Sequence, residues 1–442
     1  MTLGGAIELN PVPDPLDTCA RFAELPHLCF LDSSARGPQG RYSFLTADPV
    51  ARVGPDGDPL NAARALLAPH HRPALAGLPP FQGGIAGYLS YEWGAEQRDV
   101  PDAGLGLYDW VIAWDHTAGR SWIIAWSHER LEWAQDLLTR ESPGTLFDRP
   151  GPSSTVLQSN FTRAEYEAAV TRIREYIAAG DVYQVNLAQR FETTFDGDPL
   201  DLYRRLRARS AAPFGAYLAL DGVVIASISP ERFVRVDAGS GVAEARPIKG
   251  TRPRGASPAE DAALARALTE SEKDRAENVM IVDLLRNDLG KACRPGTVLV
   301  PELCALESHP TVHHLVSTIT GQLRDDADAF DLLRAAFPGG SVTGAPKIRA
   351  MEIIAELERA PRGVYCGAIG YISASGVMDM NIPIRTVVLQ GGAASFHAGA
   401  GIVWDSDPAA EYDETLAKAR AMIDALTQPN RDRAVTPLLS RG

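Results

Sequence analysis

Short apolar runs in the first third of the chain predict β-strands. These runs cover residues 41–46, 84–91, 110–114 and 122–126. Thr117-Ala118-Gly119 separates the last two runs and predicts a tight connection between them. The N-terminal region is therefore expected to be rich in β structure.

The hydrophobic period changes to a helical spacing after residue 160. Thr162 and Glu165 form a capping box, and Gly180 is a helix stop signal. Between them, apolar residues recur three or four positions apart, at Tyr166, Val170, Ile173 and Ile177. The pattern predicts a helix of about five turns. Further helices are expected to open at Ser257-Pro258, Ser271 and Pro346.

Glycine-containing turns predict three hairpins in the second half of the chain. They span residues 217–228, 370–389 and 387–403, with turns at Asp221-Gly222, Ser375-Gly376 and Gly391-Gly392. Strands and helices are grouped rather than strictly alternating. This grouping favours an α+β fold with large antiparallel sheets over a doubly wound parallel sheet.

The stretch from residue 141 to residue 160 is the best candidate for a boundary, because it is rich in Pro, Gly and Ser and has no apolar period. We therefore divide the chain into a β-rich region at 1–150, a main domain at 155–427 and a tail at 428–442. The tail is polar and uncapped, and it is expected to fray.

Composition and charge narrow the classes of function. The 442 residues are 45% hydrophobic and 22% charged, as in an ordinary globular protein. The net charge of −13 argues against nucleic acid or an anionic membrane as the main partner. There is no leader-like start, no run of 18 apolar residues, and no CxxC among the five cysteines. These features predict a soluble, cytoplasmic protein without structural zinc.

Two pairs of carboxylates could hold a magnesium ion, which prefers hard oxygen ligands. Asp274 and Glu277 are three residues apart, as are Glu411 and Glu414, so each pair shares one face of a predicted helix. Taken alone, each pair is more often a solvated helix face, with Glu414 paired to Lys418.

A glycine-rich turn at residues 337–347 leads into the helix expected at Pro346. Free N–H groups at a helix start attract a carboxylate or phosphate. Gly339 and Gly344 have the separation of a phosphate-binding loop, but Ala345 replaces its lysine, which excludes that type of NTPase. Gly399-Ala400-Gly401 is expected to form a second turn, either near another anion or as simple turn geometry.

The segment 246–255 carries four cations in ten residues of an acidic protein. It would attract an anionic substrate, although it also fits a solvated basic loop. Lys249 lies among three arginines, an arrangement that lowers a lysine pKa and favours a nucleophilic neutral amine. His309, His313 and His314 lack the HExxH spacing of a zinc site, so a single acid/base histidine is the better functional interpretation.

Together these segments are very similar to the chorismate-utilising enzymes over nearly the whole chain. The similar segments are residues 182–190, 229–233, 274–278, 286–288, 314–317, 344–347, 384–386 and 399–403. So many ordered matches are specific for the family. The resemblance implies its fold, in which two large antiparallel β-sheets form a sandwich core with helices packed outside.

Two positions favour one reaction of this family. Lysine at the position of Lys249 is typical of the members that make aminodeoxychorismate, whereas anthranilate synthases usually carry alanine there. Members that add water at ring carbon 2 have a lysine base where this chain has Gln184, and an amide cannot remove a proton from water. The resemblance therefore implies conversion of chorismate and ammonia to 4-amino-4-deoxychorismate, for 4-aminobenzoate and folate synthesis.

The resemblance also implies roles for the candidate residues. Lys249 would attack ring carbon 2 while the hydroxyl on carbon 4 leaves, with Glu231 as general acid and then base. Mg2+ would be held by Asp274, Glu277, Glu411 and Glu414. His314 would face the ring hydroxyl region. The substrate would be anchored by Thr343, Tyr365, Arg385, Gly399, Gly401 and Lys418.

Ammonia has to be supplied from outside the chain, because no GxCxGxQ segment of a glutamine amidotransferase is present. We therefore expect a separate amidotransferase subunit as partner, and a separate lyase for the later loss of pyruvate.

Residues 30–33 and 40–44 resemble the region that houses a tryptophan pocket in relatives, with Ser33, Arg41 and Tyr42 as candidates. Asp32 departs from the Leu-Leu-Glu-Ser pattern of anthranilate synthases. Packing and hydrogen bonding within a sheet would explain the same residues equally well.

Two alternative functions stay open. The first is anthranilate synthesis as component I, against which Lys249 counts. The second is an inactive regulatory homologue, against which the complete set of candidate catalytic residues counts.

Overall fold

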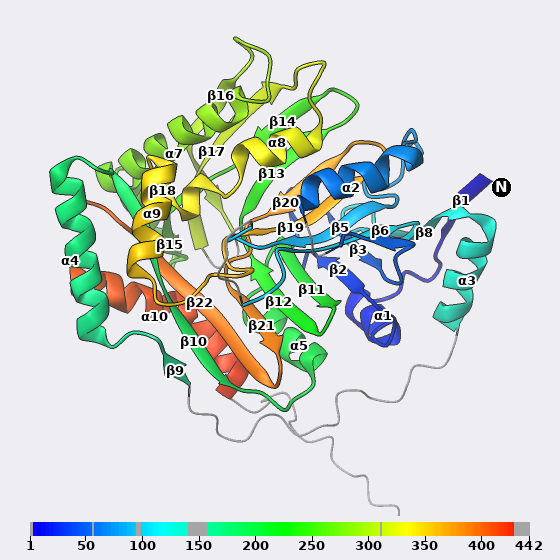
Figure 1. Ribbon diagram of the computed structural model, residues 1–442, viewed down its shortest axis with the longest axis horizontal. Helices are drawn as coiled ribbons and strands as arrows, with labels where there is room; N and C mark the ends of the chain where they lie inside the picture. Colours follow the sequence, from blue (N-terminus) through cyan, green and yellow to red (C-terminus); the bar gives the residue numbers. More distant parts are fainter. Residues whose placement is uncertain (1–2, 55–56, 94–98, 140–156, 310–311, 428–442) are drawn as a thin grey trace, which may run out of the picture.

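Two large antiparallel sheets organise the computed structural model, which describes residues 3–54, 57–93, 99–139, 157–309 and 312–427 (Figure 1). The boundary predicted at 141–160 lies mostly outside these residues, as does the predicted tail. The expected α+β architecture is confirmed.

The first sheet has twelve strands. Their order is β1 (Leu3–Glu8), β8 (Arg120–Ser127), β7 (Trp110–Asp115), β3 (Tyr42–Thr46), β2 (Leu28–Asp32), β11 (Phe214–Leu220), β12 (Val223–Ser229), β21 (Thr386–Gln390), β22 (Ala393–Ile402), β10 (Gln184–Thr194) and β18 (Gly344–Ala345), with β9 (Gln158–Ser159) beside β10.

The second sheet has ten strands. Their order is β15 (Ile248–Pro253), β17 (Val312–Gln322), β14 (Val242–Ala245), β13 (Arg232–Asp237), β20 (Met378–Asn381), β19 (Ala368–Ser373), β5 (Gly84–Leu89), β6 (Ala103–Tyr108) and β4 (Ala51–Arg52), with β16 (Leu299–Ser308) beside β17. Strands from both halves of the chain pair directly, β2 with β11 and β5 with β19, so both sheets run across the proposed boundary.

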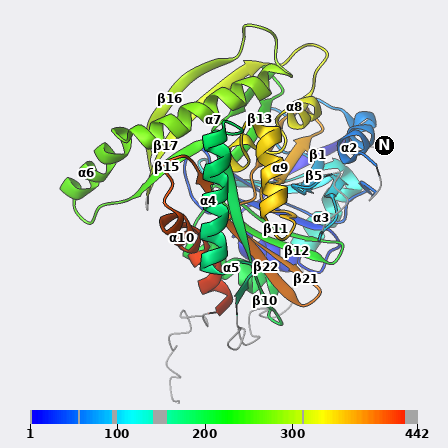
Figure 2. The ribbon, with the colours of Figure 1, turned by 60° about the vertical axis from the view of Figure 1, so that its left-hand side comes forward.

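Helices cover the outer faces of the two sheets (Figure 1). They are α1 (Pro15–Arg21), α2 (Pro59–Leu67), α3 (His128–Thr139), α4 (Arg163–Ala179), α5 (Pro199–Arg209), α6 (Pro258–Thr269), α7 (Glu272–Gly290), α8 (Ala329–Ala336), α9 (Lys347–Leu357) and α10 (Pro408–Thr427), with short 3-10 turns at η1 (Ala68–His70) and η3 (Gly340–Val342). Helices α4 and α10 pack on each other and on β22, whereas α6 and α7 lie along the second sheet (Figure 2). No helix in the described ranges is long and apolar enough to cross a membrane.

Local signals placed several elements correctly. Thr162 and Glu165 form the predicted capping box of α4, and Gly180 ends it with φ +82°. Ser257 and Ser271 cap α6 and α7 as predicted. The helix expected at Pro346 begins one residue later, with Pro346 as its N-cap.

The predicted hairpin at 370–389 is wrong in its second half. The strand after Ser375-Gly376 ends at Asn381, and the chain then crosses to the other sheet, where β21 pairs with β12 and β22. The hairpins at 217–228 and 387–403 are confirmed.

Two neighbouring crossings carry the chain between the sheets. β12 continues into β13 through residues 230–231, and β20 continues into β21 through residues 382–385. The Ile382 N–H donates to Glu231 O at 3.1 Å, and Ser229 Oγ donates to Ile382 O at 2.6 Å. Glu231 and Arg385 are therefore held at the junction of the sheets.

Candidate active site

Lys249 lies at a β-bulge of β15. Ile248 pairs with Val316 and Thr251 with His314, so three steps along β15 oppose two along β17. Such a bulge redirects a side chain out of the regular alternation. The Lys249 ammonium donates to Ser341 O at 3.1 Å. Lys249 is therefore aimed at η3 rather than lying in a solvated loop.

The segment around Lys249 is a strand, and its arginines are neutralised by acids. Arg246 pairs with Glu307, Arg252 with Asp274, and Arg254 with Asp261. The expected lowering of the Lys249 pKa holds, but its cause differs. Desolvation lowers the pKa of Lys249, and nearby Glu277 and Glu231 oppose this effect. The arginines are not its source.

Glu231 is a buried carboxylic acid, 6% exposed, at the sheet crossing. Desolvation raises the pKa of Glu231, while the Ser341 hydroxyl and Lys249 pull it back down. Ser341 Oγ donates to Glu231 Oε1 at 2.8 Å. A raised carboxyl pKa suits a general acid. Sequence inspection overlooked Ser341, although it stands in the glycine-rich turn already singled out.

His314 on β17 faces β15. Its Nδ1 lies 2.9 Å from Thr251 Oγ1. Burial, with His309 and Arg385 nearby, lowers the pKa of His314 to about 4. His314 is therefore a neutral hydrogen-bonding group at neutral pH rather than a proton donor. His313 binds Ser308 and Asp261 instead, at 2.8 Å and 2.9 Å.

The four carboxylates proposed as metal ligands lie on α7 and α10. Desolvation raises the pKa of Glu277, Lys249 and Lys273 oppose this rise, and the charges of Asp274 and Glu411 add to it. Glu411 has a pKa raised by desolvation and by Glu414. The negative charge of Glu411 on α10 therefore repels that of Glu277 on α7.

Each of these carboxylates also has a protein partner. Asp274 accepts from Arg252 at 2.9 Å, Glu411 accepts from Ser406 at 2.6 Å, and Glu414 pairs with Lys418 at 2.6 Å. Lys273 stands 4.0 Å from Glu277. Within the described ranges, no three acidic, histidine or cysteine side chains converge into a formed metal site. The four carboxylates nevertheless offer hard oxygen donors and repel one another, and both properties suit a divalent cation such as Mg2+.

Gly399 and Gly401 lie inside β22, so the predicted turn is wrong. β21 stops pairing with β22 at Phe396. Asn186 on β10 lies opposite Gly401, but its N–H donates to Thr343 O, away from β22. Asn186 and Gly401 are therefore a non-hydrogen-bonded pair, and the N–H of Gly401 points away from β10. The N–H groups of Gly399 and Gly401 therefore point to the edge that β21 has left, where they can bind an anion.

The remaining predicted substrate residues are not all brought to this edge: Lys418 contacts β22, whereas Thr343 lies across β10, where its carbonyl accepts from the Asn186 N–H. Lys418 donates to Gly399 O at 3.1 Å. Arg385 has φ +53°, an uncommon backbone conformation that is held by the crossing. Thr343 is fully buried, and its hydroxyl donates back to Gly339 O at 3.1 Å. Tyr365 stacks on His397 with ring centroids 5.2 Å apart.

Gln184 begins β10, and its side-chain amide lies against Gly401. It is fully buried, and both polar atoms of its amide lack hydrogen-bond partners in the described part of the chain. A Cβ on Gly401 would come within 2.4 Å of Gln184 Nε2, so a larger residue there would displace the Gln184 amide. Buried polar groups without partners are costly. Gln184 therefore has unused hydrogen-bonding capacity at the site.

The three N-terminal candidates line a separate cavity of about 220 Å³ between the sheets. Ser33 Oγ donates to Pro213 O at 2.7 Å. Arg41 makes a bidentate pair with Asp115, with its shortest contact 2.7 Å. The unexpected Asp32 accepts from Arg207 at 2.6 Å and from Tyr203 at 2.9 Å, so its charge is compensated.

Comparison with known proteins gives the class of this site. The family model described as chorismate binding enzyme matches residues 28–424. Aminodeoxychorismate synthase component 1 of Salmonella typhimurium is 42% identical, over 91% of this chain and 93% of the relative. Anthranilate synthase component 1 of Streptomyces coelicolor is also 42% identical, over 88% of this chain and 81% of the relative.

Solved structures agree with this class. Anthranilate synthase component I from Streptococcus pneumoniae has a TM-score of 0.77 and 33% identity, over 88% of this chain and 93% of that one. The menaquinone-specific isochorismate synthase of Escherichia coli shares the fold, with a TM-score of 0.76 at 20% identity over 96% of each chain. The chain belongs to the family of chorismate-binding enzymes.

Proposed function

We propose that this enzyme is component I of an aminodeoxychorismate synthase, which converts chorismate and ammonia to 4-amino-4-deoxychorismate. Lys249 is the observation that carries the proposal. Overall identity does not discriminate, because relatives named for aminodeoxychorismate and for anthranilate synthesis are equally similar. The lysine supplies a nucleophile, and its desolvation favours the neutral amine that attacks.

The proposed chemistry uses a covalent intermediate. Neutral Lys249 attacks ring carbon 2, both double bonds of the ring diene shift by one position, and the hydroxyl on carbon 4 leaves as water with the proton of Glu231. Ammonia then attacks carbon 4 and expels the lysine, and Glu231 takes back a proton. The enolpyruvyl group stays on the product. Arg385, Lys418 and the N–H groups of Gly399 and Gly401 would bind the substrate carboxylates, with His314 toward the ring hydroxyl.

Glu277, Glu411 and Glu414, with Asp274, would hold Mg2+. When bound, the ion would neutralise charge at the substrate carboxylate. Asp274 would have to loosen its pair with Arg252, and Glu414 its pair with Lys418. The protein is thus expected to exchange internal ion pairs for metal contacts.

Magnesium should stabilise the folded enzyme even without substrate. At 100 times its dissociation constant a ligand adds about 2.7 kcal/mol to the free energy of unfolding. We expect the melting temperature to rise with Mg2+ for the wild type and much less for Glu277→Gln and Glu411→Gln. Glu352→Gln is the control, because Glu352 is exposed and pairs with Arg349. Equal shifts in all four proteins would contradict this site.

The ammonia donor is proposed to be a glutamine amidotransferase subunit. The relatives' designation as component 1 supports a second component. All five cysteines are buried, so none is available as an exposed thiol for glutamine hydrolysis.

Product analysis tests the proposed function. Purified protein is incubated with chorismate, Mg2+ and an ammonium salt at alkaline pH, and products are separated and identified by mass. We expect an amino product that retains the enolpyruvyl group and yields 4-aminobenzoate when a lyase is added. Anthranilate with pyruvate would identify an anthranilate synthase. Chorismate binding without turnover would identify an inactive homologue.

The cavity at Ser33, Arg41 and Tyr42 is proposed to bind tryptophan. Its support is the position between the sheets and the mixed polar and aromatic lining, which includes Phe44 and Tyr371. Calorimetry with L-tryptophan should show binding to the wild type and none to Ser33→Leu, which fills the cavity. Ser34→Ala, outside the cavity lining, should bind normally. Absence of heat with the wild type, or retained binding in the filled variant, would reject this pocket.

A further inference from the structure

We infer that Ser341 is a positioning residue that holds the nucleophile and the general acid in one arrangement, and that Lys347 clamps the turn that carries it. This inference rests on the proposed roles of Lys249 and Glu231. It assigns functions to two residues that are not among the proposed ligands of substrate or metal.

Ser341 contacts both reacting groups through different atoms. Its hydroxyl donates to Glu231 Oε1 at 2.8 Å, and its carbonyl accepts from Lys249 Nζ at 3.1 Å. Ser341 is only 7% exposed. Ser341 in η3 thus sets the spacing between the Glu231 carboxyl group at the sheet crossing and the Lys249 amine at the bulge of β15.

Lys347 ties the turn that contains Ser341 to α7 and α8. Its ammonium donates to Ala336 O at 2.6 Å, where α8 ends, and to Asp288 Oδ2 at 2.7 Å on α7. Asp288 is 1% exposed. Because Lys347 itself begins α9, a single cation joins both ends of the turn to the helix that carries Asp274 and Glu277.

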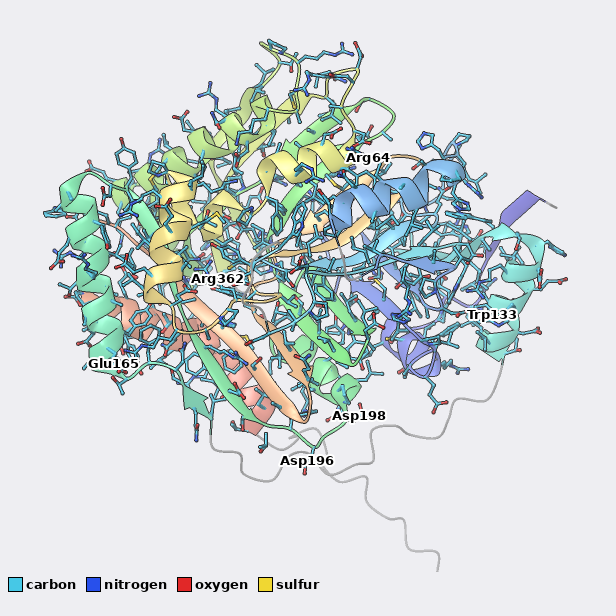
Figure 3. All side chains as sticks on the ribbon, viewed as in Figure 1. Arg64, Trp133, Glu165, Asp196, Asp198 and Arg362 are labelled. Carbon is cyan, nitrogen blue, oxygen red and sulfur yellow. The ribbon has the colours of Figure 1, made fainter. Side chains whose placement is uncertain are left out.

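Arg362 holds the same turn from the other side. It is fully enclosed, pairs with Glu358 at 2.7 Å, and donates to Val342 O at 2.9 Å and to Asn186 O at 2.7 Å. Arg362 is 2% exposed, and Figure 3 labels it next to α9. The carbonyl next to Ser341 is therefore fixed to β10, and the turn has little freedom to move its hydroxyl.

Loss of the Ser341 hydroxyl should change the behaviour of Glu231 in a defined direction. The charged groups that face Glu231 are Lys249 from β15, Lys418 from α10 and Arg385 from the second crossing. All three are cations and remain in a Ser341→Ala variant. Since the hydroxyl donates to the carboxylate, its removal destabilises the charged form and raises the pKa of Glu231.

The test measures the rate of chorismate consumption as a function of pH. Mg2+ and an ammonium salt are present, so that formation of an amino product can proceed. For Ser341→Ala we expect kcat to fall about 10- to 100-fold with a chorismate KM within about twofold of wild type. A general acid must be protonated to act, so the alkaline-side inflection, where kcat falls as Glu231 loses its proton, should move to higher pH. Ser121→Ala is the matched control, because Ser121 is fully buried in β8 and its hydroxyl has no partner in the described ranges.

Lys291, a second lysine that pairs with Asp288, is the control for the proposed role of Lys347. Lys291 pairs with Asp288 Oδ1 at 2.9 Å, but its side chain is 53% exposed. We expect Lys347→Met to lower kcat about tenfold or more, Lys347→Arg to recover part of it, and Lys291→Met to stay within about twofold of wild type. Melting temperatures identify any variant that has merely unfolded.

Each outcome decides the inference. A Ser341→Ala enzyme with wild-type kcat and an unmoved pH profile would overturn the role of Ser341. Equal losses in Lys347→Met and Lys291→Met would overturn the clamp. A wild type that makes anthranilate rejects the proposed function and the nucleophilic role of Lys249, and the kinetics of the Ser341 and Lys347 variants then decide only whether the turn positions Glu231. A wild type that consumes no chorismate rejects both the function and the inference.

Discussion

Replacing Lys249 with alanine is expected to lower kcat for aminodeoxychorismate formation by about 1,000-fold or more, because the proposed covalent intermediate cannot form. Lys249→Arg should be equally inactive, since a guanidinium stays protonated and cannot attack. Chorismate KM should change little in either variant, because the carboxylate anchors lie on β22, α10 and the crossing. Steady-state kinetics with product identification measures both parameters.

The wild-type pH profile supplies a second readout for Lys249. Desolvation lowers the pKa of Lys249 from its usual value near 10.5, and only the neutral amine is a nucleophile. Activity should therefore rise with pH up to the pKa of Lys249. Arg246→Ala is a suitable control, since Arg246 pairs with Glu307 and does not contact Lys249 Nζ. An alanine variant at Lys249 that keeps a tenth of wild-type activity would refute a covalent role.

Replacing Glu231 with glutamine is expected to lower kcat about 100- to 10,000-fold, because hydroxide would have to leave the ring without a proton donor. The amide preserves the shape of the side chain and can still accept from Ser341 Oγ. Folding and chorismate affinity should therefore stay close to wild type. Substrate binding by calorimetry and turnover by chromatography separate the two effects.

Glu358 provides the comparison for Glu231. Its side chain is also buried, 5% exposed, but it is neutralised by Arg362 at 2.7 Å, so Glu358→Gln should chiefly lower the melting temperature. If Glu231→Gln lost stability rather than turnover, its role would be structural. If it lost chorismate affinity with kcat unchanged, Glu231 would be a binding residue and the proposed acid would have to be another group.

Local structure could be predicted from the sequence because the interactions that determine it join residues close together in the chain. The capping box at Thr162, the left-handed Gly180 and the tight turn at Asp221-Gly222 each depend on a few adjacent residues. The same holds for the acid pairs on α7 and α10, whose spacing puts them on one helix face. The predictions failed where a distant partner decides the conformation. Gly399 and Gly401 resemble turn glycines, yet they lie in β22 because it pairs with β10.

By itself, the sequence determined the residue types of the site, the hairpins at 217–228 and 387–403, the helices α4, α6, α7 and α9, and the α+β class, because periodicity and capping act within one element. Only the tertiary structure decided where Lys249 points, since the bulge depends on the register between β15 and β17. It also decided that the arginines around Lys249 are neutralised, and that Ser341 joins Lys249 to Glu231. The Arg252–Asp274 and Arg254–Asp261 pairs span 22 and 7 residues. The Arg246–Glu307 pair and the two contacts of Ser341 join segments about 60 to 110 residues apart, which no local pattern encodes.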